Sequence, residues 1–451
     1  MKHLFLTRTK QCIIYSAFCI PPFCISSHLY ADEFYSPTRQ YLLGDWGGKR
    51  TTLSDQGIHF NLSFTNETAL NLDGGFNDDL TARNANQWTF GSILDLEKLW
   101  DWENTEARLS ISKRDGRSLS TDRIADPRTG QLSNVQEISG RGPVWRLSQA
   151  WLQKSFEEQG ITIKGGRMNI GEDFNSAPCE FQNLTLCGSQ VGKTVANFWY
   201  NWPITVWAAN IKYDIHPEWG VALGVYESNP ENAKQSKGFN LSTDGSKGVL
   251  IPLEFIWKPQ LNGLDGLYRF GAFYSTADAT DVLTDEHGNA QLAAQHRQVH
   301  SGKYNTWFVA QQQLTQYSDD PKRGLVAYFN LNINDKATSQ ILGSQQVILQ
   351  YKGLFDIRPN DSIGFGVART QVNKRLRERQ ILSNEVNQVS DYGNSLFTPV
   401  QYDETNVELN YTLNWSPSVM FRPNIQFVHQ AGGVKEVKDA WVLGLTTRLN
   451  F

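Results

Sequence analysis

The sequence has no long hydrophobic run beyond its first 31 residues, and this absence limits how the chain can meet a membrane. A membrane-spanning helix needs about 20 consecutive, predominantly apolar residues. No stretch after residue 31 provides them, so an α-helical membrane protein is excluded. The remaining backbone arrangement that satisfies its own hydrogen bonds in lipid is a closed β-barrel.

The sequence also lacks enzyme signatures and any large excess of charge. It contains no HExxH, GxSxG, Walker loop or dinucleotide-binding glycine pattern. Paired carboxylates such as Asp78-Asp79 and Asp319-Asp320 are adjacent, which does not give the roughly 5 to 10 Å separation that glycoside hydrolysis requires. The formal net charge is -4 with 20% charged residues, which argues against a nucleic-acid-binding surface. We therefore expect neither an enzyme nor a nucleic-acid-binding protein, and no cofactor or metal.

Cysteine is scarce, with five in 451 residues. Three of them fall in the N-terminal apolar segment, which leaves Cys179 and Cys187 as a pair. Seven residues separate these two, too many for a CxxC redox motif, and no nearby histidine or cysteine completes a zinc site. An exported chain meets an oxidising compartment. We therefore predict a structural Cys179–Cys187 disulfide that closes a loop.

The first 31 residues have the features of an export signal. A basic start precedes an apolar run from Cys12 to Ile25, and Leu29-Tyr30-Ala31 is a plausible cleavage site. A membrane anchor is the alternative, but Pro21 and Pro22 interrupt the run, which is shorter than a membrane span. We predict three segments: a signal peptide over 1–31, a periplasmic N-terminal segment over 32–56 and an outer-membrane β-barrel over 57–451.

The rest of the chain repeatedly alternates apolar and polar residues in segments of about ten. In the first such segment one side carries Ile58, Phe60, Leu62 and Phe64, and the other carries His59, Asn61, Ser63, Thr65 and Glu67. Residues 105–114 and 404–415 repeat the pattern. A soluble β-sandwich also alternates but buries its apolar face. Aromatic residues on apolar faces near strand ends favour a barrel with interfacial girdles instead: Trp88, Trp145, Trp257, Tyr351, Trp415 and Trp441.

Short and long connections alternate along the chain. Short links include 157–160, 216–219 and 416–418, and long ones include 115–143, 171–203, 277–302 and 374–402. This is the layout of an up-and-down transmembrane barrel with short periplasmic turns and long extracellular loops. We predict about 16 antiparallel strands, enough to enclose a water-filled channel. The last strand alternates apolar residues up to the terminal Phe451, an end that looks like the signal read by barrel-assembly machinery.

Several short motifs occur in order along the chain: Gly44-Asp45-Trp46-Gly47-Gly48-Lys49-Arg50, Trp151-Leu152, Gly166-Arg167-Met168-Asn169, Cys179-Glu180-Phe181, Leu186-Cys187-Gly188, Gly353-Leu354-Phe355, Arg358-Pro359, Glu408-Leu409-Asn410-Tyr411, Arg422-Pro423-Asn424-Ile425-Gln426 and Gly432-Gly433. In this order they resemble the OprB family of carbohydrate-selective porins. The resemblance covers nearly the whole mature chain. It implies a sixteen-stranded outer-membrane channel selective for small neutral sugars such as glucose. It leaves open the preferred sugar and whether the barrels associate as a homo-trimer.

A sugar-selective pore needs polar groups for the hydroxyls and aromatic faces for the C–H surfaces of the ring. We therefore take as candidate pore-lining or sugar-binding residues Glu106, Arg108, Arg146, Lys164, Glu172, Asp173, Glu254, Arg269, Arg422, Trp199 and Trp202. Arg108, Arg146 and Lys164 are predicted to form one basic wall of the eyelet. Glu172 and Asp173 would face that wall from the following loop. The alternative for each residue is a solvated pore position with no individual role.

The loop from Gly171 to Pro203 is long, carries both cysteines and is rich in aromatics. Its disulfide would restrict it and could hold it inward as a constriction. The alternative is that its aromatics pack the loop onto the barrel rim. The basic run Lys374 to Arg379 is open to two readings, contact with lipopolysaccharide phosphates or a solvated loop face.

Three functional classes therefore compete: a sugar-selective porin, a non-specific diffusion porin, and an exported soluble carbohydrate-binding β-protein. We favour the first, in contact with outer-membrane lipid and lipopolysaccharide.

Overall fold

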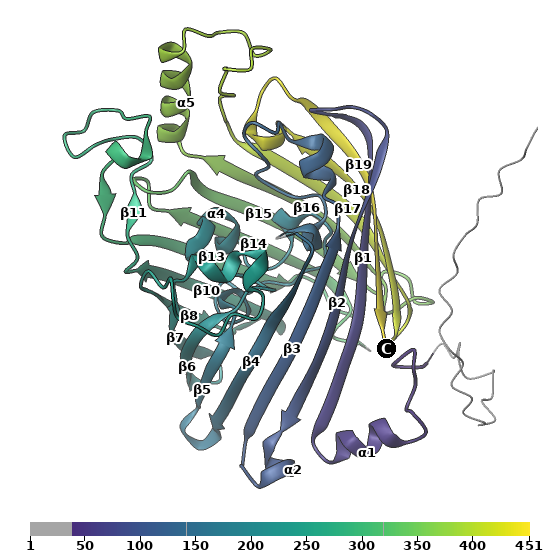
Figure 1. Ribbon diagram of the computed structural model, residues 1–451. Helices are drawn as coiled ribbons and strands as arrows, with labels where there is room; N and C mark the ends of the chain where they lie inside the picture. The colour runs from purple at the N-terminus through teal and green to yellow at the C-terminus, as the bar shows by residue number, and fades with distance from the viewer. Residues whose placement is uncertain (1–37, 141, 319) are drawn as a thin grey trace, which may run out of the picture. The chain divides into compact units, whose positions relative to one another are not determined.

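The computed structural model describes residues 38–140, 142–318 and 320–451, and the predicted signal peptide lies outside them. Sixteen long strands account for most of these described residues (Figure 1). They are β1 (Ile58–Gly75), β2 (Thr81–Asp95), β3 (Thr105–Gly116), β4 (Val144–Phe156), β5 (Ile161–Met168), β6 (Val206–His216), β7 (Trp219–Glu227), β8 (Val249–Trp257), β10 (Leu264–Ser275), β13 (Lys303–Gln313), β14 (Gly324–Asn334), β15 (Ile341–Lys352), β16 (Ser362–Val372), β17 (Glu404–Ser416), β18 (Val419–His429) and β19 (Lys438–Asn450).

The strands form one closed antiparallel barrel. Each long strand pairs with the next one along the chain, and β1 pairs with β19 to close the sheet, with Leu70 opposite Leu443. Short strands add local pairings: β9 (Gln260–Leu261) beside β10, and β11 (Ala279–Thr280) with β12 (Val299–His300). Among the described residues no helix has the length and apolarity to cross a membrane. The predicted sixteen-stranded barrel is confirmed.

Along the strands, apolar side chains are exposed and polar side chains are buried, the reverse of the pattern in a soluble protein. The outward side chains of Leu109, Leu409 and Trp415 are 48%, 48% and 64% exposed. Their inward neighbours are polar and buried, as with Ser110 on β3 and Glu408 on β17. Apolar surface outside and polar groups inside is the arrangement of a barrel in lipid. The predicted alternation is confirmed, and its apolar face is the outer one.

The connections differ between the two ends of the barrel. One end, called here the short-turn end, carries 96–104, 157–160, 217–218, 258–263, 314–323, 353–361 and 417–418. The other, the long-loop end, carries 76–80, 117–143, 169–205, 228–248, 276–302, 335–340, 373–403 and 430–437. The short helix α2 (Leu96–Trp100) lies in a turn of the first end and the longer α5 (Lys374–Val386) in a loop of the second.

Most basic residues of the run in α5 form hydrogen bonds or ion pairs within the protein. Arg375 pairs with Asp281 at 2.5 Å, and Arg379 donates to the carbonyl of Val282, which joins α5 to the loop 276–302. Arg377 donates to the carbonyl of Gln401. Lys374 is exposed and makes no side-chain hydrogen bond or ion pair within the described part of the chain, so a contact with lipopolysaccharide stays a prediction.

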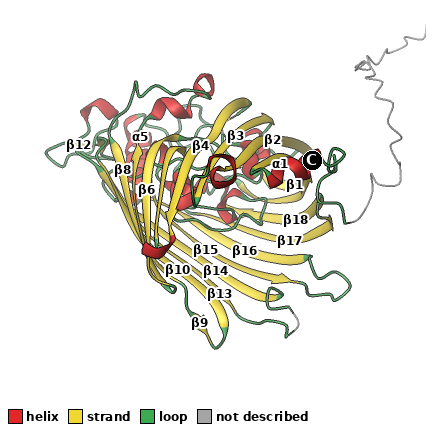
Figure 2. Cartoon of the chain, turned by 90° about the horizontal axis from the view of Figure 1, so that it is seen from below, coloured by secondary structure: helices red, strands yellow, loops and turns green. Residues whose placement is uncertain are grey.

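Two long loops fold into the barrel rather than away from it. Seen from the short-turn side, helices and loops occupy the space inside the ring of strands (Figure 2). The first is 117–143, with the turn η3 (Glu137–Ser139). The second is 169–205, with α3 (Ile170–Asp173), η5 (Leu184–Leu186) and α4 (Val191–Thr194). These inward loops decide where the channel is open.

Candidate functional site

The loop 169–205 is fixed across the inside of the barrel by buried carboxylates of the strands. Glu408 on β17 accepts the backbone N–H groups of Gln182 at 3.0 Å and Asn183 at 2.7 Å. Glu254 on β8 accepts the N–H of Asn175 at 2.9 Å. Both carboxylates are fully buried. Hydrogen bonds to a charged acceptor are stronger than neutral ones, so the wall holds this loop firmly.

Apolar packing completes the attachment of this loop. Trp199 is fully buried and meets Trp307 on β13 edge-on, with ring centroids 5.5 Å apart. Phe181 and Leu186 pack against Ile348 and neighbouring residues of the opposite wall. The loop therefore combines both of the expected arrangements, because it is folded inward and its aromatics pack against the barrel.

The disulfide closes the middle of the same loop. Cys179 and Cys187 are joined, with their Cα atoms 4.0 Å apart, as the sequence predicts. Within the described part of the chain, the one set of ligating side chains close enough to share a metal is this pair with Glu137. The sulfur–sulfur bond takes up both thiols, so these residues do not form a zinc or other metal site.

The loop 117–143 lies beside the first and is joined to it. Glu137 donates its N–H to the carbonyl of Gln182 at 2.9 Å, and Leu184 donates to Asn134 at 2.8 Å. Gln136 Nε2 reaches the carbonyl of Glu67 on β1 at 2.7 Å. Together the two loops cover the inner faces of β8, β13 to β19 and β1.

The inner face of β2 and β3 is covered less completely. Gln87 on β2 and Glu106 and Arg108 on β3 are half-buried, unlike the fully buried Glu254 and Glu408 across the barrel. Within residues 38–140, 142–318 and 320–451, no side-chain hydrogen bond or ion pair is found for Glu106 or Arg108. Polar groups that keep exposure inside a barrel are in contact with water, so we take this wall as the candidate open side of the lumen.

Polar side chains of β2 to β4 contact polar side chains of the two inward loops on this side of the barrel, in two hydrogen-bonded groups, and we take the whole set as the candidate constriction. We call it the polar ring: Gln87, Arg114, Glu137, Gln149, Glu172 and Trp202. Gln87 Oε1 accepts both Arg114 Nε at 2.7 Å and Trp202 Nε1 at 3.3 Å. Arg114 lies 3.8 Å from the carboxylate of Glu137. Gln149 donates to Glu172 at 2.6 Å. Strands and both loops thus contribute to one set of donors, acceptors and an aromatic face.

Lys193 in α4 adds a titratable charge beside the ring. Its ammonium donates to the carbonyls of Leu184 and Cys187. Burial lowers the pKa of Lys193 to about 7, and the nearby Glu137 carboxylate offsets part of that effect. Lys193 is therefore positively charged in acidic solution and largely neutral in mildly basic solution.

The predicted basic wall is not a row of free cations. Arg146 is buried and donates to the carbonyls of Asn232 and Ala233, so it attaches the loop 228–248. Lys164 pairs with Asp173 at 2.9 Å and lies over the Trp151 ring. Arg108 keeps its partial exposure.

The other predicted residues divide between the passage and the walls. Glu172 and Trp202 belong to the polar ring. Glu254 pairs with Arg269 at 2.9 Å against the loop 169–205, and Trp199 lies in the packed core. Arg422 pairs with Glu180 nearer the short-turn end.

Four members of the polar ring were missed as individual candidates: Gln87, Arg114, Glu137 and Gln149. Arg114 stands out in sequence only as one of several polar-face residues of 105–114. A neutral amide on a polar strand face carries no distinguishing signal. Glu137 lies in a loop whose inward fold depends on contacts distant in sequence.

Comparison with known proteins agrees with the barrel fold. Residues 79–451 match the family described as "Carbohydrate-selective porin, OprB family". The chain is 53% identical over 429 residues to "Putative porin QuiX" of Acinetobacter baylyi, covering 93% of this chain and 95% of that protein. It is 44% identical over 447 residues to "Porin B" of Pseudomonas aeruginosa, covering 98% of each. The solved "High pH structure of Pseudomonas putida OprB" superposes with a TM-score of 0.90 at 47% identity, covering 92% of this chain and 100% of that one.

Proposed function

Because the chain belongs to the OprB family of carbohydrate-selective porins, we propose that its polar ring is the constriction that selects small sugars. The protein itself is an outer-membrane porin, through which small carbohydrates diffuse passively into the periplasm. The short-turn end then faces the periplasm and the long-loop end faces the exterior.

The observation that carries the proposal is the shared amide of Gln87. One acceptor oxygen receives hydrogen bonds from a guanidinium of β3 and an indole of the loop 169–205. A sugar hydroxyl can replace either donor, because hydroxyls both donate and accept. The indole of Trp202 offers an apolar face for the C–H surface of the ring. The ring therefore combines the two kinds of contact that a hexose requires.

The charges in the ring suit a neutral solute. Arg114 is balanced by Glu137, and Glu172 is engaged by the amide of Gln149. A solute without net charge exchanges one hydrogen bond for another without leaving an unpaired charge. Such exchange keeps binding weak, and a channel conducts only if the solute also leaves readily.

Glu106 and Arg108 on β3 lie between the polar ring and the short-turn end, and neither side chain is paired within the described residues. We assign them to solute passage rather than to selection. Contact with lipid through the outward apolar residues, and recognition of the terminal Phe451 during assembly, complete the proposed partners. The proposed role is transport without catalysis.

A non-specific porin would have the same barrel, so conductance in a planar bilayer with glucose added decides between the two. The proposal predicts a saturable block of ion current by glucose. Arg114→Gln should weaken the block about tenfold, the loss of one charge-assisted hydrogen bond. Lys113→Gln is the matched control, since Lys113 is the next residue along β3 and outside the ring. A reduction of current that follows viscosity alone, or equal blocks in both variants, would contradict the proposal.

A further inference from the structure

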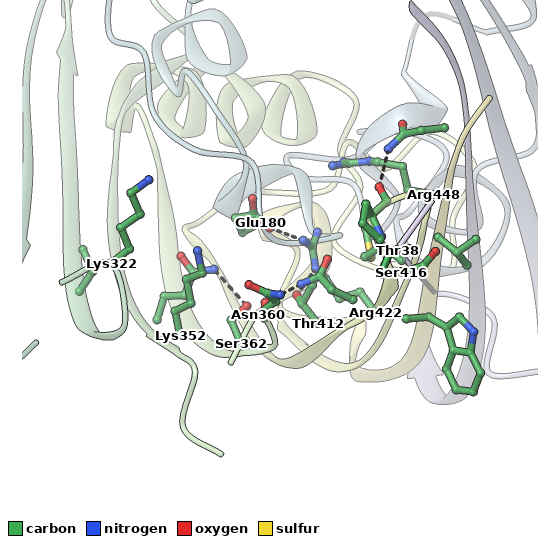
Figure 3. A pocket seen from close by; sticks show the side chains of 18 of the residues that line it. Thr38, Glu180, Lys322, Lys352, Asn360, Ser362, Thr412, Ser416, Arg422 and Arg448 are labelled. Carbon is green, nitrogen blue, oxygen red and sulfur yellow. Dashed lines mark hydrogen bonds and ion pairs between the residues drawn. The ribbon is translucent and has the colours of Figure 1, made fainter. Parts of the chain in front are cut away.

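A second hollow lies inside the barrel at the short-turn end, lined by none of the polar-ring residues. It has a volume of about 930 Å³ and is bordered by the periplasmic ends of β14 to β19 and by Glu180 from the loop 169–205 (Figure 3). This volume is larger than a single hexose requires. The hollow is therefore a separate compartment on the way out of the channel.

The charges around this hollow are strongly unequal. Among the described residues that line it, the basic ones are Lys322, Lys352, Arg422 and Arg448, and Glu180 is the one carboxylate. Glu180 pairs with Arg422, and Figure 3 shows this pair at one side and the two lysines at the other. Lys322, Lys352 and Arg448 form no ion pair with any acid of the described residues. Three uncompensated positive charges therefore face the same space.

Neutral hydrogen-bonding groups lie between these cations. The lining includes Gln350, Asn360, Ser362, Thr412 and Asn414. Some of their capacity is used, because Arg422 Nε donates to the Thr412 hydroxyl at 2.7 Å and Asn414 Nδ2 donates to the carbonyl of Asn360 at 2.7 Å. The remaining lone pairs and protons offer partners for hydroxyl groups.

We propose that this hollow is a binding site for small hydroxylated carboxylates, such as sugar acids, so that the channel takes these anions as well as neutral sugars. The lysine and arginine side chains would pair with the carboxylate of the ligand. The amide and hydroxyl side chains of the lining would form hydrogen bonds with its hydroxyl groups. Clustered positive charges between low-dielectric walls strengthen the local electric field, and this field raises the concentration of anions in the hollow. Lipid phosphates are not the ligand, because Lys352, Arg422 and Arg448 lie on the inward faces of β15, β18 and β19, in register with the buried residues Gln346, Gln426 and Thr446. This inference rests on the porin function proposed above.

The probes are gluconate and glucose, titrated separately into planar bilayers that contain single channels. The native channel should be half-blocked by gluconate at a lower concentration than by glucose. The triple variant Lys322→Gln, Lys352→Gln, Arg448→Gln should raise the half-blocking concentration of gluconate about tenfold, because it removes the attracting field. The same variant should leave the block by glucose unchanged, since it does not alter the polar ring.

Two further variants serve as controls. Lys98→Gln removes an exposed lysine of the short-turn end that does not line the hollow, and it should behave as the native channel. Lys322→Arg, Lys352→Arg, Arg448→Lys keeps every charge and should keep the block by gluconate, so a folding defect of the neutral triple variant does not hide the answer. Equal blocks by gluconate and glucose in the native channel, or an unchanged gluconate block in the neutral triple variant, would overturn the inference. Saturable glucose block alongside either result leaves the proposed function standing, whereas absent glucose block contradicts that function separately.

Discussion

The carboxylate of Glu408 accepts the backbone N–H of Asn183 at 2.7 Å, and so a strand of the wall holds the constricting loop inside the barrel. The two residues are far apart in sequence, and both are fully buried. This contact, with the hydrogen bond that Glu408 accepts from Gln182, holds the loop against the inner face of β17.

Glu408→Gln tests this attachment. The amide keeps the shape but has a single acceptor oxygen, so one of the two backbone N–H groups of Gln182 and Asn183 loses its partner, at a cost of about 1 to 3 kcal/mol. We expect a larger and noisier single-channel conductance and a weaker block by glucose, because the loop leaves its place more often. Glu106→Gln is the control, since Glu106 lies on the inward face of β3 and its side chain forms no hydrogen bond or ion pair with any described loop residue. Identical current traces for the two variants would show that Glu408 does not position the loop.

Removal of the disulfide should affect the loop and leave the barrel intact. Closing a ring of this size restricts the loop by about 2 to 3 kcal/mol in the chain-entropy model. In Cys179→Ser, Cys187→Ser we expect added current fluctuations with unchanged heat-modifiable migration on a gel. Reduction of the native protein should reproduce the fluctuations. A loss of the folded gel species would mean that the disulfide supports the barrel itself.

Arg50 in α1 (Lys49–Asp55) closes the seam where the first and last strands meet. Its guanidinium donates to the carbonyls of Phe451 at 2.9 Å and Phe60 at 3.2 Å and lies 3.4 Å from the Tyr41 ring centroid. Arg50→Ala should lower stability by about 2 to 4 kcal/mol, measured as a lower temperature for the gel shift. The exposed Lys49 provides the control as Lys49→Ala, and an equal shift in both variants would remove Arg50 from the seam.

The barrel could be predicted from the alternation of apolar and polar residues, because successive residues of each strand face lipid and water in turn. Leu109 and Ser110 suffice to show which way β3 faces. The alternation of apolar and polar residues did not distinguish the role of Arg146 from that of Arg108. Both lie on inward strand faces, but the loop 228–248 returns over Arg146 and uses its donors. The docking of a loop is set by contacts that no local pattern reveals, which is also why Gln87 was missed.

The lowered pKa of Lys193 predicts a pH-dependent selectivity. Below about pH 7 the ammonium is charged and favours chloride, and above it the charge is lost as the group releases its proton. The ratio of chloride to potassium permeability should therefore fall between pH 6 and 8. Lys193→Gln should show the high-pH ratio throughout, and Lys193→Arg the low-pH ratio throughout. A step that persists in both variants would assign the titration to another group.

The central claim is that alternate residues of a strand face lipid and water, with water inside. Single cysteines at positions 106 to 109 of β3 test it most directly, in reconstituted protein treated with a charged, membrane-impermeant thiol reagent. Cysteines replacing Glu106 and Arg108 should react and reduce the conductance, while those replacing Ala107 and Leu109 should be unreactive and have a neighbouring fluorophore quenched by brominated lipid. Reaction at 107 and 109 with protection at 106 and 108 would contradict the account.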